Sequence, residues 1–269
     1  MARPASPTGL AALSAVVAGT ASGRLRGKRL LAMVALLGLP LLIQVGALVW
    51  QSERGSGFAH FVTMVDATYL RILLPLALIF LGTAAFGDEW EAGTACYVIG
   101  LPVPRSLLVV GRWLASFLRA LVLAVPAVVT LYVLCLVKHE GALAHYLPDL
   151  LSVLLGMALV MAGYTAVFIF LGLALRRSVM TALGYVLLFE GFIGNMPLGF
   201  SILSLSFHSR NLIWHLTGND GFRPPMISTE LIEPTALLTS LLWMIGYQVV
   251  FLALATRWLK RKEFSGTVG

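Results

Sequence analysis

The sequence predicts an all-α membrane protein that crosses the bilayer several times, and three observations support this fold class. Of the 269 residues, 59% are hydrophobic and only 12% are charged, with a mean hydropathy of +0.91. A soluble domain carries about 25% charged residues, so this chain has too few to cover a water-facing surface. Its apolar runs reach the roughly 20 residues that a spanning helix needs, whereas the short alternating segments of a membrane β-barrel are missing from the sequence.

Six apolar segments are predicted to be membrane spans, with both termini in the cytoplasm. The predicted spans are 30–50, 68–86, 113–137, 148–175, 179–195 and 234–256. Cytoplasmic loops carry an excess of Lys and Arg. With the N-terminus inside, thirteen of the 19 such residues fall on the inner side, four on the outer side and two within spans. This asymmetry accounts for the net charge of +7 without a nucleic-acid partner. We expect one transmembrane domain, 1–269, in the cytoplasmic (inner) membrane, in contact with its lipids.

The first 29 residues are predicted to lie on the cytoplasmic surface. Leu10, Leu13 and Val17 fall at i, i+3 and i+7, on one face of a helix. A secretory signal peptide has its basic residues before the apolar run, whereas here the basic cluster at 24–29 follows it. We therefore interpret 1–29 as an uncleaved, weakly amphipathic surface helix.

Two loops are too elaborate to be simple turns. The cytoplasmic segment 87–112 begins with the acids Asp88, Glu89 and Glu91 and, as a helix, has one apolar and one acidic face before Pro102 ends it. Such an apolar face favours contact with the lipid interface or with a partner protein. The outer segment 196–233 opens with the apolar stretch MPLGFSILSLSF, which is too short to span and is interpreted as re-entrant or interfacial.

Several polar residues lie inside the predicted spans, and Glu190, Gln44 and Arg119 are candidates for a substrate path. A charge inside the membrane marks a functional site by default, but Glu190 fits equally well as a protonated or hydrogen-bonded structural group, or as a partner of Arg119. We expect Arg119 to extend toward the interface and Gln44 either to line a path or to form an interhelical hydrogen bond. Asp66 and Arg71 are expected to form an ion pair near the outer end of the second span.

Motifs for catalysis, metal binding and nucleotide binding are missing from the sequence. All the histidines fall on the predicted outer side, and their spacing provides no ligand set, so we expect surface histidines and no metal site. These are His60, His139, His145, His208 and His215. A nucleotide-binding loop needs G-x-x-x-x-G-K-[ST], whereas the only Gly-Lys pair, Gly27-Lys28, precedes Arg29. We therefore predict no catalytic residue and no cofactor in this chain.

The segment 87–112 also contains a pattern of the form E-x-E-x-G-T, then Pro-x-x-Arg and then Gly-basic. It is present as Glu89-Trp90-Glu91-Ala92-Gly93-Thr94, Pro102, Arg105 and Gly111-Arg112. This pattern, with the six-span layout, the surface helix and the re-entrant segment, resembles the permease subunits of type-two ABC exporters. Trp90 stands where that family often has a basic residue, and Arg112 where it usually has lysine.

The resemblance implies that 87–112 contains a coupling helix that docks on a cytoplasmic ATPase. Two permeases, as a homodimer or with a paralogous permease, would join two ATPases that bind ATP and Mg. The residues assigned to coupling are Asp88, Glu89, Glu91, Gly93, Thr94, Pro102 and Arg105. The implied function is outward transport of an amphiphilic or lipid-like substrate, although the sequence leaves its identity open. One alternative is a related permease that serves extracytoplasmic protein or metal-site maturation or signalling. Another is a non-transporting membrane scaffold or sensor.

Overall fold

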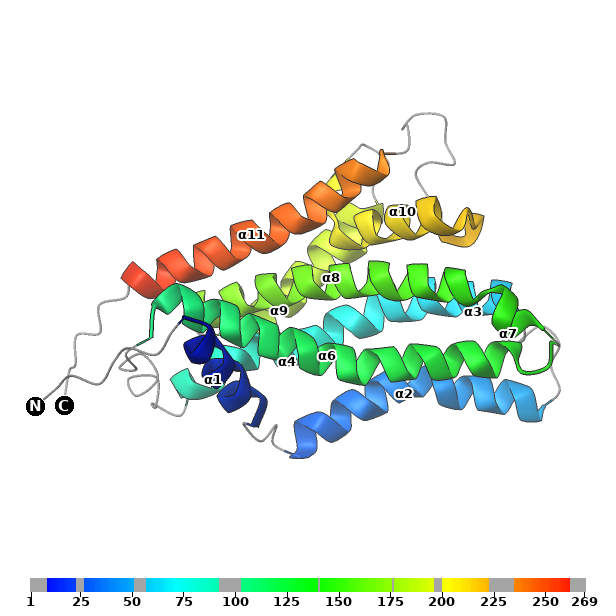
Figure 1. The fold of residues 1–269 in the computed structure, drawn as a ribbon, viewed down its shortest axis with the longest axis horizontal. Coiled ribbons are helices and arrows are strands. Elements are labelled where there is room, and N and C mark those ends of the chain that lie inside the picture. Colours follow the sequence, from blue (N-terminus) through cyan, green and yellow to red (C-terminus); the bar gives the residue numbers. More distant parts are fainter. Residues whose placement is uncertain are drawn as a thin grey trace, which may run out of the picture.

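The computed structural model of the chain is a bundle of helices (Figure 1). It describes residues 9–22, 27–50, 57–91, 103–139, 141–175, 177–195, 200–222 and 235–261, and all regular structure within them is helical. The main elements, in chain order, are α1 (Gly9–Ser22), α2 (Gly27–Val49), α3 (Phe58–Met64), η2 (Val65–Leu73), α4 (Leu74–Glu91), α6 (Arg105–Leu136), α7 (Ala142–His145), α8 (Leu147–Ala174), α9 (Ser178–Tyr185), η3 (Val186–Phe192), η4 (Ile193–Asn195), η5 (Phe200–Leu203), α10 (Leu205–Thr217), η6 (Asp220–Phe222) and α11 (Leu237–Arg261).

Five helices in the described residues are long and apolar enough to cross a membrane. They are Leu30–Val49, Phe58–Gly87, Arg105–Leu136, Leu147–Ala174 and Leu237–Arg261. The fifth predicted span, 179–195, corresponds to a shorter apolar helix, Ser178–Phe192, so a sixth membrane crossing stays a prediction. Figure 1 shows α1, the end of α4, the start of α6 and the end of α11 at one end of the bundle, which the charge pattern predicts to be cytoplasmic.

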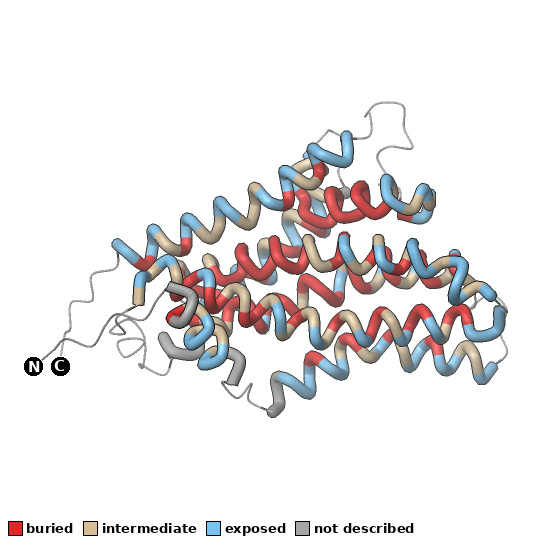
Figure 2. Tube along the Cα trace, in the orientation of Figure 1, coloured by how far each residue is buried: buried red, intermediate tan, exposed pale blue. Residues whose placement is uncertain are grey.

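Helix α8 is the centre of the bundle, and most of its residues from Val153 to Leu173 are buried (Figure 2). It contacts α4, α6, α10 and α11. Glycines allow the closest of these contacts. A Cβ at Gly82 of α4 would lie 2.5 Å from Cβ of Phe168, and one at Gly163 of α8 would lie 3.0 Å from the side chain of Leu205. Small residues let helix backbones approach closely where lipid supplies no hydrophobic drive for association.

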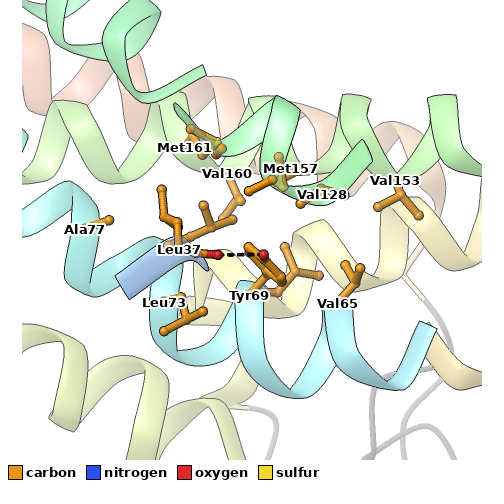
Figure 3. Packing of buried hydrophobic residues seen from close by; sticks show 14 of the residues in the cluster. Leu37, Val65, Tyr69, Leu73, Ala77, Val128, Val153, Met157, Val160 and Met161 are labelled. Atoms are coloured by element: carbon orange, nitrogen blue, oxygen red, sulfur yellow. Dashed lines mark hydrogen bonds between the residues drawn. The ribbon is translucent and has the colours of Figure 1, made fainter. Parts of the chain in front are cut away.

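The second span is longer than the predicted 68–86 and changes its helical register partway. It begins at Phe58 and passes through the π-helix η2 before α4 begins. The wider turn of a π-helix brings residues five apart to the same side, so that Arg71 lies 3.2 Å from Asp66, as expected for this pair. Figure 3 shows Tyr69 of η2 donating a hydrogen bond of 2.8 Å to the carbonyl of Leu37, one turn before Pro40 interrupts the ladder of α2.

The outer segment predicted to be re-entrant contains a buried helix, α10. Its residues from Leu205 to Ile213 are all buried, and it packs against α8 and α11. In Figure 1 it begins beside the middle of α8 and runs toward the end of the bundle where α7 lies. Residues 196–199 and 223–234 lie outside the described part of the chain, and the depth of α10 in a membrane stays a prediction.

Polar side chains attach α10 to two neighbouring helices. The Arg210 guanidinium lies 2.6 Å from the carboxylate of Asp66, and both side chains are about nine-tenths buried. His208 contacts the hydroxyl of Ser240 on α11 at 3.2 Å, and Asn211 donates to the same hydroxyl at 2.8 Å. The interpretation of the histidines as surface groups is therefore wrong for His208, which is fully buried.

We expect Gly82→Ala to destabilise the bundle and Gly46→Ala to leave it unchanged or slightly more stable. Both changes add one methyl group to a helix, but the Cβ at Gly82 meets Phe168, whereas nothing lies within 4 Å of the Cβ position at Gly46. Overpacking costs about 1–3 kcal/mol. Thermal unfolding in detergent, followed by the monodisperse fraction after heating, measures the difference. Equal melting temperatures for the two variants would show that α4 and α8 are not in close contact.

Candidate functional site

The predicted coupling segment lies between the end of α4 and the start of α6. The backbone of α4 continues through Asp88, Glu89 and Glu91, whose side chains are not among those described. Gly93, Thr94 and Pro102, also assigned to coupling, lie outside the described residues. Helix α6 begins at Arg105, directly after the proline at its N-cap. The structure therefore describes the two flanks of this segment.

The first flank is held by Arg112 of α6. Its guanidinium donates a hydrogen bond to the carbonyl of Ala85 and lies over the ring of Phe86, 4.4 Å from the centroid. The residue is only 6% exposed. A desolvated cation–π contact is worth about 2 kcal/mol. Arg112 thus attaches α6 to the last two turns of α4, directly before the acidic residues.

The second flank is held by Arg105, which contacts the last turn of α11. Its Nη1 donates to the carbonyl of Leu259 at 2.8 Å and to that of Lys260 at 3.0 Å. The last carbonyls of a helix have no partner within the helix, so this guanidinium satisfies two of them. The resemblance assigned Arg105 to the coupling segment. The structure adds that it joins the segment to the C-terminal end of α11.

Helix α1 packs against the same region. A Cβ at Gly111 would lie 2.7 Å from Cγ1 of Val16 and 3.5 Å from Cδ1 of Leu13. Gly111, the residue before Arg112, therefore leaves space for α1, since a side chain at this position would displace that helix. The prediction of a helix in 1–29 is confirmed for Gly9–Ser22, and part of its apolar face, including the predicted Leu13 and Val17, is half-buried, with α6 as its neighbour.

Glu190, a candidate for the substrate path, lies at the N-terminus of α10. Its Oε2 accepts hydrogen bonds from the hydroxyls of Ser204, at 2.5 Å, and of Ser206. The backbone N–H of Leu205 donates to its Oε1 at 3.1 Å and that of Ser206 to its Oε2 at 3.3 Å. A helix N-terminus leaves N–H groups without intrahelical partners and favours a negative charge. Glu190 lies in η3 and caps the N-terminus of α10. This geometry agrees with the interpretation of Glu190 as a hydrogen-bonded structural group.

The other two candidates for the substrate path have different surroundings. Gln44 is fully buried and accepts a hydrogen bond of 3.0 Å from Nε2 of His60, which joins α2 to α3 as the interhelical alternative expects. Arg119 is half-buried on α6, and its pairing with Glu190 stays a prediction. Sequence reasoning missed Arg210 as a partner of Asp66. The available signal was an arginine, Arg210, within the outer segment 196–233. Its partner Asp66 lies 144 positions earlier in the chain, so the sequence alone did not indicate the pair.

Comparison with known proteins identifies the family. A family model described as ABC-2 family transporter protein matches residues 25–194, more than half of the chain. The chain belongs to this family. The match covers α2 to η3, and therefore both flanks of the coupling segment and Glu190. A search of the curated proteins finds no match. Membership in the ABC-2 family makes this chain a transmembrane component and implies an ABC ATPase partner, in a typically dimeric arrangement.

We expect Glu190→Ala to lower the stability of the ABC-2 protein by about 1–3 kcal/mol, because the buried N–H groups of Leu205 and Ser206 would lose their acceptor. Glu190→Gln keeps one carbonyl oxygen and is expected to cost less. Leu188→Ala, on the exposed side of the same segment, is the matched control. Melting temperatures in detergent provide the measurement. If Glu190→Ala melts like Leu188→Ala, the cap of α10 does not depend on this carboxylate.

Proposed function

We propose that this protein is the transmembrane subunit of an ATP-driven exporter in the cytoplasmic (inner) membrane, with the whole chain forming one permease domain. A separate ATPase, in two copies that bind ATP and Mg, docks on the segment 87–105, and a second permease completes the transporter. The observation that carries the proposal is the attachment of both flanks of that segment to spanning helices. Arg112 joins it to α4, and Arg105 joins it to α11. Movement of a docked ATPase would therefore act on both helices.

The close helix contacts extend this connection through the bundle. Gly172 of α8 lies against Thr83 of α4, where an added Cβ would be 2.9 Å from the Thr83 carbonyl oxygen, and Gly156 lies against Ile213 of α10. Packed interiors resist deformation and move as units. The helices α4, α8 and α10 are thus suited to move as one body when the cytoplasmic end of α4 is displaced.

An apolar groove on α11 supports an amphiphilic substrate. The groove has a volume of about 590 Å³, within the 300–1,000 Å³ range of small-molecule sites. It is lined by Thr239, Leu242, Trp243, Gly246, Tyr247, Val250 and Phe251. Tyr247 also donates to the carbonyl of Leu203, just before α10. The groove therefore lies next to the end of α10 that Glu190 caps, and its aromatic side chains suit an apolar chain with a polar end.

Charge reversal in Glu89→Lys/Glu91→Lys is expected to abolish the ATPase activity that the permease stimulates, because both carboxylates belong to the proposed docking helix. The protein should still insert and fold, since these residues lie beyond the apolar part of α4. Co-purification with the ATPase in mild detergent, with vanadate-sensitive ATP hydrolysis, measures docking. Asp220→Lys reverses an exposed charge on η6 and is the control. Full stimulation in the double variant would contradict the docking site, and a stable permease that binds no ATPase would contradict the exporter.

Substitution of Arg112 by Gln is expected to separate docking from transport. The variant keeps a hydrogen-bond donor for Ala85 but loses the cation over Phe86, so we expect a roughly tenfold lower transport per ATP hydrolysed with ATPase binding unchanged. Arg177→Gln, which removes an exposed cation before α9, is the control. Transport into proteoliposomes and ATP hydrolysis are measured on the same preparation. An unchanged ratio of transport to hydrolysis would show that Arg112 has only a structural role.

A further inference from the structure

A second groove lies between α6 and α11 at the predicted cytoplasmic end of the bundle, separate from the apolar groove on α11. Its volume is about 520 Å³. The lining residues are Val110, Leu252, Ala253, Thr256, Arg257 and Lys260. We propose that this groove binds one anionic phospholipid, with its phosphate at the two cations and the upper part of an acyl chain along the apolar residues. This proposal is independent of the exported substrate.

The order of residues along α11 matches the order of groups in a phospholipid. Leu252 and Ala253 form the apolar part with Val110 of α6, and Arg257 and Lys260 follow one and two turns later. At 1.5 Å per residue, about 6 Å separates Ala253 from Arg257 along the helix axis. Both cations are exposed. A lysine or arginine near an anionic membrane surface contributes about 1 kcal/mol of attraction.

Arg105 changes the electrostatics at the end of this groove in favour of an anion. The carbonyl end of a helix is negative and would repel a phosphate. Here the Arg105 guanidinium covers the carbonyls of Leu259 and Lys260. The anion would therefore meet the positive charges of Arg105, Arg257 and Lys260 at the end of α11, and no carboxylate is among the residues that line the groove.

The surroundings of the groove favour a lipid over a soluble anion. Leu254 and Trp258, on the same stretch of α11, are 41% and 42% exposed. Exposed apolar side chains on a spanning helix contact acyl chains, and Trp is enriched at the level of the headgroups. A free phosphate ion would use the cations but would leave the apolar wall formed by Val110 and Leu252 without a partner.

Native mass spectrometry of the purified full-length protein, titrated with dioleoyl phosphatidylglycerol or dioleoyl phosphatidylcholine, tests the proposal. We expect the wild type to retain phosphatidylglycerol more strongly than phosphatidylcholine. The double variant Arg257→Gln/Lys260→Gln should bind phosphatidylglycerol about 30-fold more weakly, whereas Arg177→Gln should bind like the wild type. The charge-preserving exchange Arg257→Lys/Lys260→Arg should retain binding, and melting temperatures verify that each variant is folded.

Three outcomes would overturn the proposal. Equal phosphatidylglycerol affinity in the wild type and in Arg257→Gln/Lys260→Gln would exclude the two cations as the headgroup site. Equal affinity of the wild type for the two lipids would leave only a non-selective apolar contact. Ala253→Trp fills the groove and is expected to reduce lipid retention. If it instead dissociates a permease dimer and leaves lipid binding unchanged, the groove belongs to the contact between two copies of the chain.

Discussion

The arrangement of the bundle depends on hydrogen bonds at the start of α10. A helix that begins inside a helical bundle has N–H groups that neither water nor lipid can satisfy. Glu190 of η3 accepts from these groups with both of its oxygens, and Ser204 adds its own hydroxyl as acceptor for the N–H of Phe207 at 3.2 Å. A buried charge is costly unless it is hydrogen-bonded, and here the carboxylate and the N–H groups satisfy one another. The position of α10 between α8 and α11 depends on these hydrogen bonds.

Once α10 is capped, its remaining polar groups determine which helices surround it. Arg210 pairs with Asp66 in the π-helical part of the second span, and His208 and Asn211 share the hydroxyl of Ser240 on α11. A buried ion pair contributes little net stability, but removing one partner leaves a buried charge. These contacts therefore favour one arrangement of neighbours over others. The irregular register of η2 is part of that arrangement, because it holds Asp66 between Arg71 and Arg210.

The sequence was sufficient for features that depend on composition and local pattern, and insufficient for those that depend on distant contacts. Apolar length predicted Leu30–Val49, Leu147–Ala174 and Leu237–Arg261 to within five residues at each end. The third predicted span, 113–137, was wrong at its start, because α6 begins at Arg105. The π-helix was not predictable, since no local residue pattern distinguishes it from α-helix. The partners of Glu190 lie 14 to 16 positions later in the chain, and Gly82 meets Phe168 from another helix. Arg105 and Arg112 were recognised as a pattern, but their acceptors on α11 and α4 required the fold.

The two arginines attach the coupling segment to different parts of the bundle. Arg112 contacts α4, whose glycine contacts with α8, and those of α8 with α10, leave no room for sliding. Arg105 contacts α11, where open grooves line both the middle and the end of the helix. A shift of the segment between these arginines would therefore act on α4 through Arg112 and on the C-terminal end of α11 through Arg105.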